Sequence, residues 1–310
     1  MPKPKTVLAA LAALVAVAGS AAPARAWDEL GHRVVARIAW ENMTPEARAA
    51  AVRLLENGPL NAGLRELLPA VGTPEERQRE LFVMAAYWPD MIRGREHPGY
   101  RFAHSDWHYV NFFWEQKPDG SKVDRDDLPR AGLLLDQLQR IRTGLADASR
   151  PDSLRAVDLA WALHLVGDAH QPLHNSARIT AQDPEGDRGA NSFLLKGVYP
   201  FSNLHSYWDG LVGLSVPWAA GDRGEADYVG SIARRVMLAY PPRRMDGRLY
   251  PGEFERWSRE GVRVAQNVAY TTLRNERPSL AYRDRAWAAA EPRVALGGYR
   301  LAELLNRALG

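Results

Sequence analysis

Residues 164–174 read HLVGDAHQPLH, and this stretch does most to decide the fold and the chemistry of the chain. We expect a helix over residues 152–170, because apolar residues recur at helical spacing and Pro172 cannot continue a helix. His164 and Asp168 are four residues apart, so a helix places them on one face. The same stripe carries the apolar residues Leu154, Val157 and Trp161. We therefore expect the pair to point into the core, where an ionised aspartate is costly unless it is compensated.

The His-x-x-x-Asp spacing occurs a second time, at His205 and Asp209. A divalent metal ion is a natural compensation for both pairs, since neutral imidazole and carboxylate are good zinc ligands. Because Pro172 ends the first helix, His174 lies on a turn from which it can reach a second metal ion. A single pair of this kind is equally typical of a hydrogen-bonded core pair. Two pairs and His174, in a chain with only eight histidines, favour metal binding.

Helical signals dominate the rest of the chain. Thr44 precedes Pro45 as an N-cap, and residues 73–76 (Thr-Pro-Glu-Glu) have the spacing of a capping box that opens a helix ending before Pro89. Further helices are predicted over 128–145, 152–170, 203–212, 225–240, 252–273 and in two segments of 280–309 divided by Pro292. Strand signals are limited to residues 107–114 and a hairpin over 191–198. The sequence therefore predicts a single, predominantly α-helical domain with a minor β-hairpin.

The first 26 residues have the pattern of an export signal. Lys3 and Lys5 precede an apolar run over 6–18, and residues 24–26 (Ala-Arg-Ala) form a cleavage site. Removal of residues 1–26 takes three basic and no acidic residues away, so the formal charge falls from +3 to zero and gives no argument for nucleic-acid binding. We expect an exported protein, periplasmic or secreted, with no membrane anchor after cleavage. The absence of cysteine excludes disulfides, Cys-ligated zinc and a catalytic thiol.

Cleavage after residue 26 makes Trp27 the first residue of the mature chain, 27–310, with His32 five positions later. A terminal amine and its own carbonyl oxygen can chelate a metal ion in a five-membered ring. Trp27 is otherwise simply an aromatic residue at a cleavage site.

Six stretches together give the chain a resemblance to a known family. They are WDELGH at 27–32, WPDMIR at 88–93, DWHYVN at 106–111, HLVGDAHQPLH at 164–174, DRGAN at 187–191 and NLHSYWDG at 203–210. In content and order they resemble the S1/P1 nucleases, which are tri-zinc phosphodiesterases with the helical fold shared with zinc-dependent phospholipase C. The resemblance implies hydrolysis of the 3′-O–P bond of single-stranded DNA and RNA to 5′-phosphate products, with 3′-nucleotidase activity. We expect a monomer.

The resemblance also implies which residues hold the three zinc ions. The first ion would be held by Asp90, His108, His164 and Asp168. The second would be held by the amine and carbonyl of Trp27 and by His32, with Asp168 bridging to the first. The third would be held by His174, His205 and Asp209. Two zinc ions a few ångströms apart can lower the pKa of a shared water to about 7, which suits attack on an anionic phosphodiester.

The family's substrate-contacting positions match less closely. Asp90 is expected to orient the attacking water, and Arg93 to stabilise charge on the phosphoryl group, although a surface salt bridge also explains an arginine there. Tyr109 matches a position used for base stacking. Asn111 stands where fungal members carry aspartate, and Asn191 follows Ala190 where the family has Gly-Gly-Asn, so base preference is open. His170 is expected only to pack or to contact the metal ligands.

Two other functions fit part of this pattern. Zinc-dependent phospholipase C also begins at tryptophan, but the spacing from Trp27 to His32, aspartate at position 209 and Asn191 favour the nuclease. A non-catalytic zinc-binding protein is the second alternative. Nine ligands for three metal ions argue against it, because a structural zinc site closes with four protein ligands.

Overall fold

The computed structural model describes residues 27–310 of the chain. Near the start of this range, a threonine caps the N-terminus of each of two helices. The Thr44 hydroxyl accepts a hydrogen bond from the Ala47 N–H (3.2 Å) and opens α2 (Pro45–Glu56). Thr73 and Glu76 form a reciprocal capping box at the start of α3 (Pro74–Ala85). Both predicted helix starts are confirmed. α3 ends before Pro89, and this proline lies in the first turn of α4 (Trp88–Met91).

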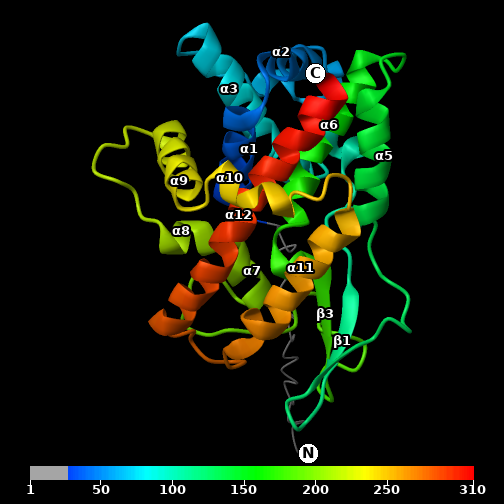
Figure 1. The fold of residues 1–310 in the computed structure, drawn as a ribbon, viewed down its shortest axis with the longest axis vertical. Coiled ribbons are helices and arrows are strands. Elements are labelled where there is room, and N and C mark those ends of the chain that lie inside the picture. Colours follow the sequence, from blue (N-terminus) through cyan, green and yellow to red (C-terminus); the bar gives the residue numbers. More distant parts are fainter. Residues whose placement is uncertain (1–26) are drawn as a thin grey trace, which may run out of the picture.

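Helices make up most of the described chain, and the predicted all-α class is confirmed (Figure 1). The sequence patterns gave no helix before residue 44, yet α1 (Glu29–Asn42) begins directly after Asp28, whose carboxylate caps it by accepting a hydrogen bond from the Gly31 N–H. The remaining helices are α5 (Leu134–Ala146), α6 (Asp152–Asp168), α7 (Leu204–Asp209), α8 (Leu211–Ser215), α9 (Glu225–Ala239), α10 (Pro242–Met245), α11 (Phe254–Asn267) and α12 (Leu280–Leu309).

Helix α6 lies at the centre of the fold. It contacts α1, α2, α3, α4, α5 and α12, and from residue 158 to its end every residue is buried. A helix that is apolar on all sides is expected in such a position. His164 and Asp168 are fully buried there, as expected, and so is Trp161. Leu154 was predicted to share this buried stripe but is 47% exposed, because the first turn of α6 lies at the surface.

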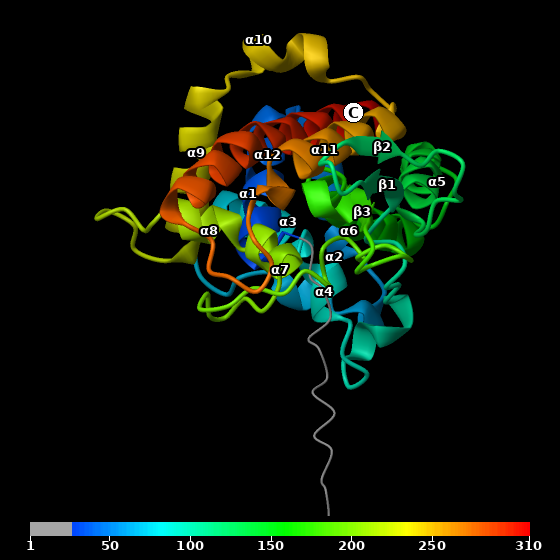
Figure 2. The same ribbon diagram turned by 90° about the horizontal axis from the view of Figure 1, so that it is seen from below.

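The prediction that Pro292 divides the last helical region is wrong. α12 runs without interruption from Leu280 to Leu309 and crosses the molecule beside α1 (Figures 1 and 2). An internal proline costs a helix about 3 kcal/mol. Packing of α12 against α1, α2, α5, α6, α8 and α9 outweighs that cost.

A small sheet of order β2-β1-β3 covers one end of the helices. β1 (Phe112–Gln116) pairs antiparallel with β2 (Lys122–Asp124) and parallel with β3 (Ser176–Ile179), so the one hairpin in the described chain joins β1 to β2. The strand predicted over 107–114 overlaps β1 only at its end. The hairpin predicted over 191–198 is wrong, because its backbone bonds to other segments, for example from the Lys196 N–H to the Glu276 carbonyl.

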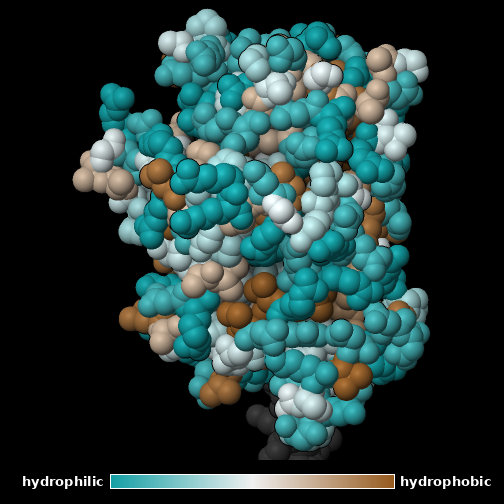
Figure 3. All heavy atoms as spheres, viewed as in Figure 1, coloured by the Kyte–Doolittle hydropathy of each residue, from teal (hydrophilic) through white to brown (hydrophobic). Residues whose placement is uncertain are grey.

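The surface view shows a mostly hydrophilic face with apolar side chains in small groups (Figure 3). Between residues 27 and 310, no helix combines the length and the apolar character needed to cross a bilayer. Residues 1–26, the predicted export signal, lie outside the described part of the chain.

Candidate metal centre

Three groups of buried histidine and aspartate side chains meet at one end of α6. Within each group the candidate ligand atoms lie within 4.8 Å of one another. The groups are His32, His164 and Asp168; Asp90, His108 and His164; and His174, His205 and Asp209. Six of these eight residues come from α1, α4, α6 and α7. His108 lies shortly before β1, and His174 lies in the short 3-10 helix Pro172–Asn175 that follows α6, so the fold assembles side chains that are far apart in the sequence.

Asp168 connects the first two groups. Its Oδ1 lies 3.3 Å from His32 Nε2, and its Oδ2 lies 3.2 Å from His108 Nδ1 and 3.4 Å from His164 Nε2. Neither carboxylate oxygen has a hydrogen-bond partner in the described structure, although both are buried. Burial raises the pKa of Asp168 well above its usual value, and the nearby Asp90 carboxylate raises it further. The position between the groups is the one expected for a bridging ligand.

In the third group, two imidazole nitrogens face each other. His174 Nδ1 donates to the His108 carbonyl (2.6 Å), and His205 Nδ1 donates to the Gly189 carbonyl (2.5 Å). Each ring therefore presents a lone pair at Nε2, and the two Nε2 atoms are 3.0 Å apart. Two lone pairs at this distance repel unless a cation or proton lies between them. Burial lowers the pKa of His205 to about 4 and that of His174 well below its usual value, which disfavours the proton.

These donor sets fit zinc. They supply neutral imidazole and carboxylate, the atoms that zinc prefers, and carbonyl groups orient the rings of His164, His174 and His205 through Nδ1. Gln171 was not singled out from the sequence, yet its side-chain amide donates to Asp209 Oδ1 (2.6 Å) and holds that carboxylate in place.

The first residue of the described chain lies beside the third group. Trp27 is fully buried against the first turn of α1, and the Asp28 N–H donates to the Asp209 carbonyl (3.0 Å). The backbone of residues 27–28 is thereby tied to the end of the helix that carries His205 and Asp209.

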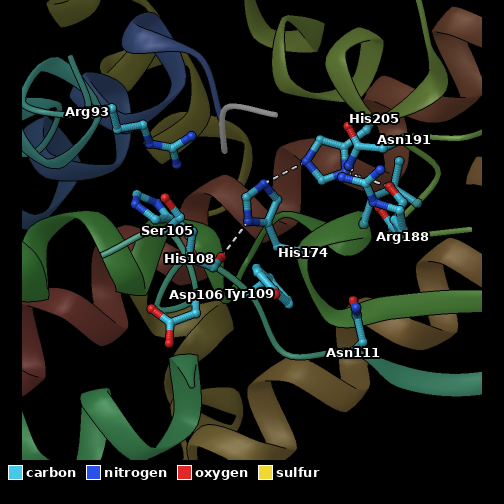
Figure 4. Close-up of a pocket in the computed structure, with 12 residues that line it drawn as sticks. Arg93, Ser105, Asp106, His108, Tyr109, Asn111, His174, Arg188, Asn191 and His205 are labelled. Carbon is cyan, nitrogen blue, oxygen red and sulfur yellow. Dashed lines mark hydrogen bonds between the residues drawn. The ribbon is translucent and has the colours of Figure 1, made fainter. Parts of the chain in front are cut away.

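A cavity of about 390 Å³ opens beside these groups, with His108, His174 and His205 in its lining (Figure 4). It brings together the three residues predicted to contact substrate, Tyr109, Asn111 and Asn191, with Arg93. Arg93 Nη2 lies 2.9 Å from Asp90 Oδ1. The lining also contains three residues that sequence reasoning missed, Ser105, Asp106 and Arg188. Two of these had a signal in the sequence, because Asp106 opens the DWHYVN stretch and Arg188 stands directly before the Gly-Ala-Asn that matches the family motif.

The carbonyl that orients His205 belongs to a glycine with no room for a side chain. Gly189 has a φ of +63°, and a Cβ there would lie 2.4 Å from the Leu173 carbonyl oxygen and 3.3 Å from His205 Nδ1. We expect Gly189→Ala to displace this carbonyl and weaken metal binding by the third group about 10–100-fold, the usual cost of losing an orienting partner. Competition with a chromophoric chelator measures this.

Gly120→Ala is the matched control, because Gly120 also has a positive φ (+84°) but a Cβ there meets nothing within 4 Å. Equal losses of metal affinity in both variants would show that backbone strain alone is responsible.

Two buried arginines of α12 support the turn between Asp168 and His174. Arg293 donates to the carbonyls of Ala169 (3.1 Å) and His170 (3.4 Å), and Arg300 donates to His170 Nε2 (2.8 Å). Glu260 of α11 pairs with both guanidinium groups. His170 is fully buried and acts as a packing residue, as the sequence suggested.

Comparisons with known proteins agree with this geometry. The profile of the S1/P1 nuclease family matches residues 27–310. Endonuclease 2 of Arabidopsis thaliana is 24% identical over 92% of this chain and 91% of its own length. Endonuclease 1 of the same plant is 29% identical over 61% of this chain and 55% of its own. Nuclease P1 of Penicillium citrinum is 23% identical over 59% of this chain and 57% of its own. The match across the whole described chain makes this protein a member of the S1/P1 nuclease family, and therefore a hydrolase that acts on phosphodiester bonds.

Proposed function

We propose that the mature chain, residues 27–310, is a zinc-dependent nuclease that hydrolyses the 3′-O–P bond of single-stranded DNA and RNA to 5′-phosphate products and also removes phosphate from 3′-nucleotides. The observation that carries the proposal is the set of three buried His/Asp groups, two of which contribute histidines to the lining of one cavity. A leader over residues 1–26 would export the protein to the periplasm or the medium, where it would act as a monomer.

Nine residues would hold three zinc ions. One ion would be held by Asp90, His108, His164 and Asp168; one by the Trp27 amine and carbonyl and His32, with Asp168 shared; and one by His174, His205 and Asp209. Bound zinc at such a site neutralises phosphate charge and lowers the pKa of water. Trp27 can offer a free amine only when residue 26 has been removed.

The chain's own side chains would position the substrate. The Arg93 guanidinium, held by Asp90, faces the cavity and would donate to the phosphoryl oxygens as negative charge grows on them. The Asp90 carboxylate would also orient the attacking water. Tyr109 would stack on an unpaired base, which explains a preference for single strands, and Asn111 and Asn191 would offer amide groups to the base or sugar.

The direct test is hydrolysis of single-stranded DNA by protein that begins at Trp27, with added zinc, with and without a chelator. We expect release of 5′-nucleotides that the chelator abolishes, together with binding of three zinc ions per chain measured by elemental analysis. No release from protein that holds three zinc ions would contradict the proposal, and hydrolysis of phospholipid by that protein would favour a phospholipase C instead.

A further inference from the structure

One wall of the cavity is a turn in which three successive residues adopt left-handed backbone conformations. The φ angles are 57° at Arg188, 63° at Gly189 and 63° at Ala190. Glycine adopts this conformation freely, but arginine and alanine lose about 1–2 kcal/mol each. Backbone strain of this kind persists where the surroundings enforce it, and it gathers at functional sites.

Buried hydrogen bonds enforce this turn. The fully buried Asp187 carboxylate accepts from the N–H groups of Arg178 (3.0 Å) and Ala190 (3.1 Å). The Asn191 side-chain amide donates to the Arg188 carbonyl (2.8 Å). Both ends of the turn are therefore fixed, and the direction in which the Arg188 side chain leaves the backbone is fixed with them.

The Arg188 side chain is exposed and lines the cavity across from Arg93, with His174 between them (Figure 4). Arg93 is paired with Asp90 next to the metal groups. Within residues 27–310, no carboxylate lies within ion-pair distance of Arg188, and no ring stacks on its guanidinium. An unpaired guanidinium held at the wall of a cavity is suited to bind a phosphate, through two parallel N–H donors.

We propose that Arg188 binds a phosphate adjacent to the scissile one and so makes the enzyme prefer strands over mononucleotides. This inference rests on the proposed function, in which the scissile phosphate lies over the metal groups beside Arg93. A 3′-mononucleotide carries one phosphate and leaves Arg188 without a partner. A longer strand carries a second phosphate that reaches across the cavity to Arg188.

The test compares two substrates, 3′-thymidine monophosphate and a short oligothymidylate. In Arg188→Ala, kcat/KM for the oligonucleotide is expected to fall about tenfold more than kcat/KM for the mononucleotide, since one charge-assisted contact is lost. Arg188→Gly removes the same charge, and glycine adopts the positive φ freely. The two substrates can therefore be compared in this variant even if alanine disturbs the turn.

Binding gives a second readout that does not depend on turnover. Fluorescence anisotropy of labelled oligothymidylate with chelator-treated protein measures how Kd varies with salt. Loss of one phosphate contact is expected to reduce the slope of log K against log salt concentration by roughly 0.7, and Arg188→Lys is expected to retain it. Arg223→Ala is the matched control: this arginine is 91% exposed, lies before α9 outside the cavity lining and pairs with Asp227, so both readouts stay at wild-type values.

Equal falls for both substrates, or an unchanged salt slope in Arg188→Gly, would overturn the assignment of Arg188. If the wild-type protein hydrolyses neither substrate, the proposed function itself is wrong and the inference falls with it.

Discussion

Replacing Asp168 with alanine is expected to reduce hydrolysis of single-stranded DNA by about 10³-fold or more. This carboxylate lies within 3.2–3.4 Å of ring nitrogens from His32, His108 and His164, so its loss breaks two of the three groups at once. Metal ions bound as proposed would supply several kcal/mol of charge stabilisation in the transition state, and each 1.36 kcal/mol is a factor of ten in rate. Zinc content should fall from three ions to one.

The same substitution should not destabilise the metal-free protein. Without metal, Asp168 is a buried acid whose pKa burial raises, and its ionised form costs folding free energy at neutral pH. Thermal unfolding in chelator should therefore show an equal or higher Tm for Asp168→Ala. Asp158→Asn is the control: it removes another buried carboxylate from α6, one that pairs with Arg140 and Arg150 and not with the histidines, and should leave the zinc content unchanged. Wild-type activity in Asp168→Ala would contradict the bridging role.

Replacing Glu260 with glutamine is expected to lower the free energy of unfolding by about 3–5 kcal/mol, the usual cost of breaking a buried ion pair. Glu260 carries the negative charge that faces Arg293 and Arg300, which are 3% and 1% exposed. Without it, two buried guanidinium groups lie side by side with only carbonyl and imidazole partners. Urea unfolding of metal-free protein measures the change.

Acid should reproduce part of this effect in the wild-type protein. Burial alone would raise the pKa of Glu260, but hydrogen bonds from Arg300 and the charge of Arg293 outweigh it and lower the pKa below 4.5. A lowered carboxyl pKa contributes stability at higher pH, and this contribution is lost as pH falls through the folded-state value.

Glu255→Gln is the matched control for Glu260→Gln. Glu255 lies on the same helix, and its partners Arg130 and Arg259 are exposed, so the change should stay below about 1 kcal/mol. If the free energy of unfolding falls equally in both glutamine variants, the burial of the Glu260 ion pairs does not explain their contribution to stability.

Local patterns predicted those parts of the fold that local physics decides. The caps at Thr44 and Thr73 depend on hydrogen bonds within one turn, and the pairing of His164 with Asp168 depends only on helical spacing. The predicted break at Pro292 was wrong because it depends on distant contacts: packing of α12 against helices far away in the sequence offsets the free-energy cost of a proline inside the helix. The expected hairpin over 191–198 failed because its N–H groups donate outside the segment or to the turn before it: that of Ser192 to Asp187, that of Leu195 to Ser202 and that of Lys196 to Glu276.

The residues of the candidate site also fall into those that the sequence could predict and those that it could not. Histidines and aspartates could be selected because their residue types and spacings carry metal chemistry. Gln171 and Asp187 could not be selected, because they act through hydrogen bonds that exist only after folding. Arg188 could be noticed in the sequence only by its place beside the Gly-Ala-Asn that matches the family motif. Its interest comes from a backbone conformation that the buried Asp187 helps to fix.

The hydrogen bonds from Arg293 to the turn after α6 also determine when during synthesis this turn becomes supported. α12 comes more than a hundred residues after that turn, so a ribosome releases the histidines long before it releases the arginine that holds their turn. A nascent chain thus has the ligands but not the support that keeps them in place. Zinc should be acquired only after the last helix has docked, and products of premature termination should remain metal-poor even when every ligand is present.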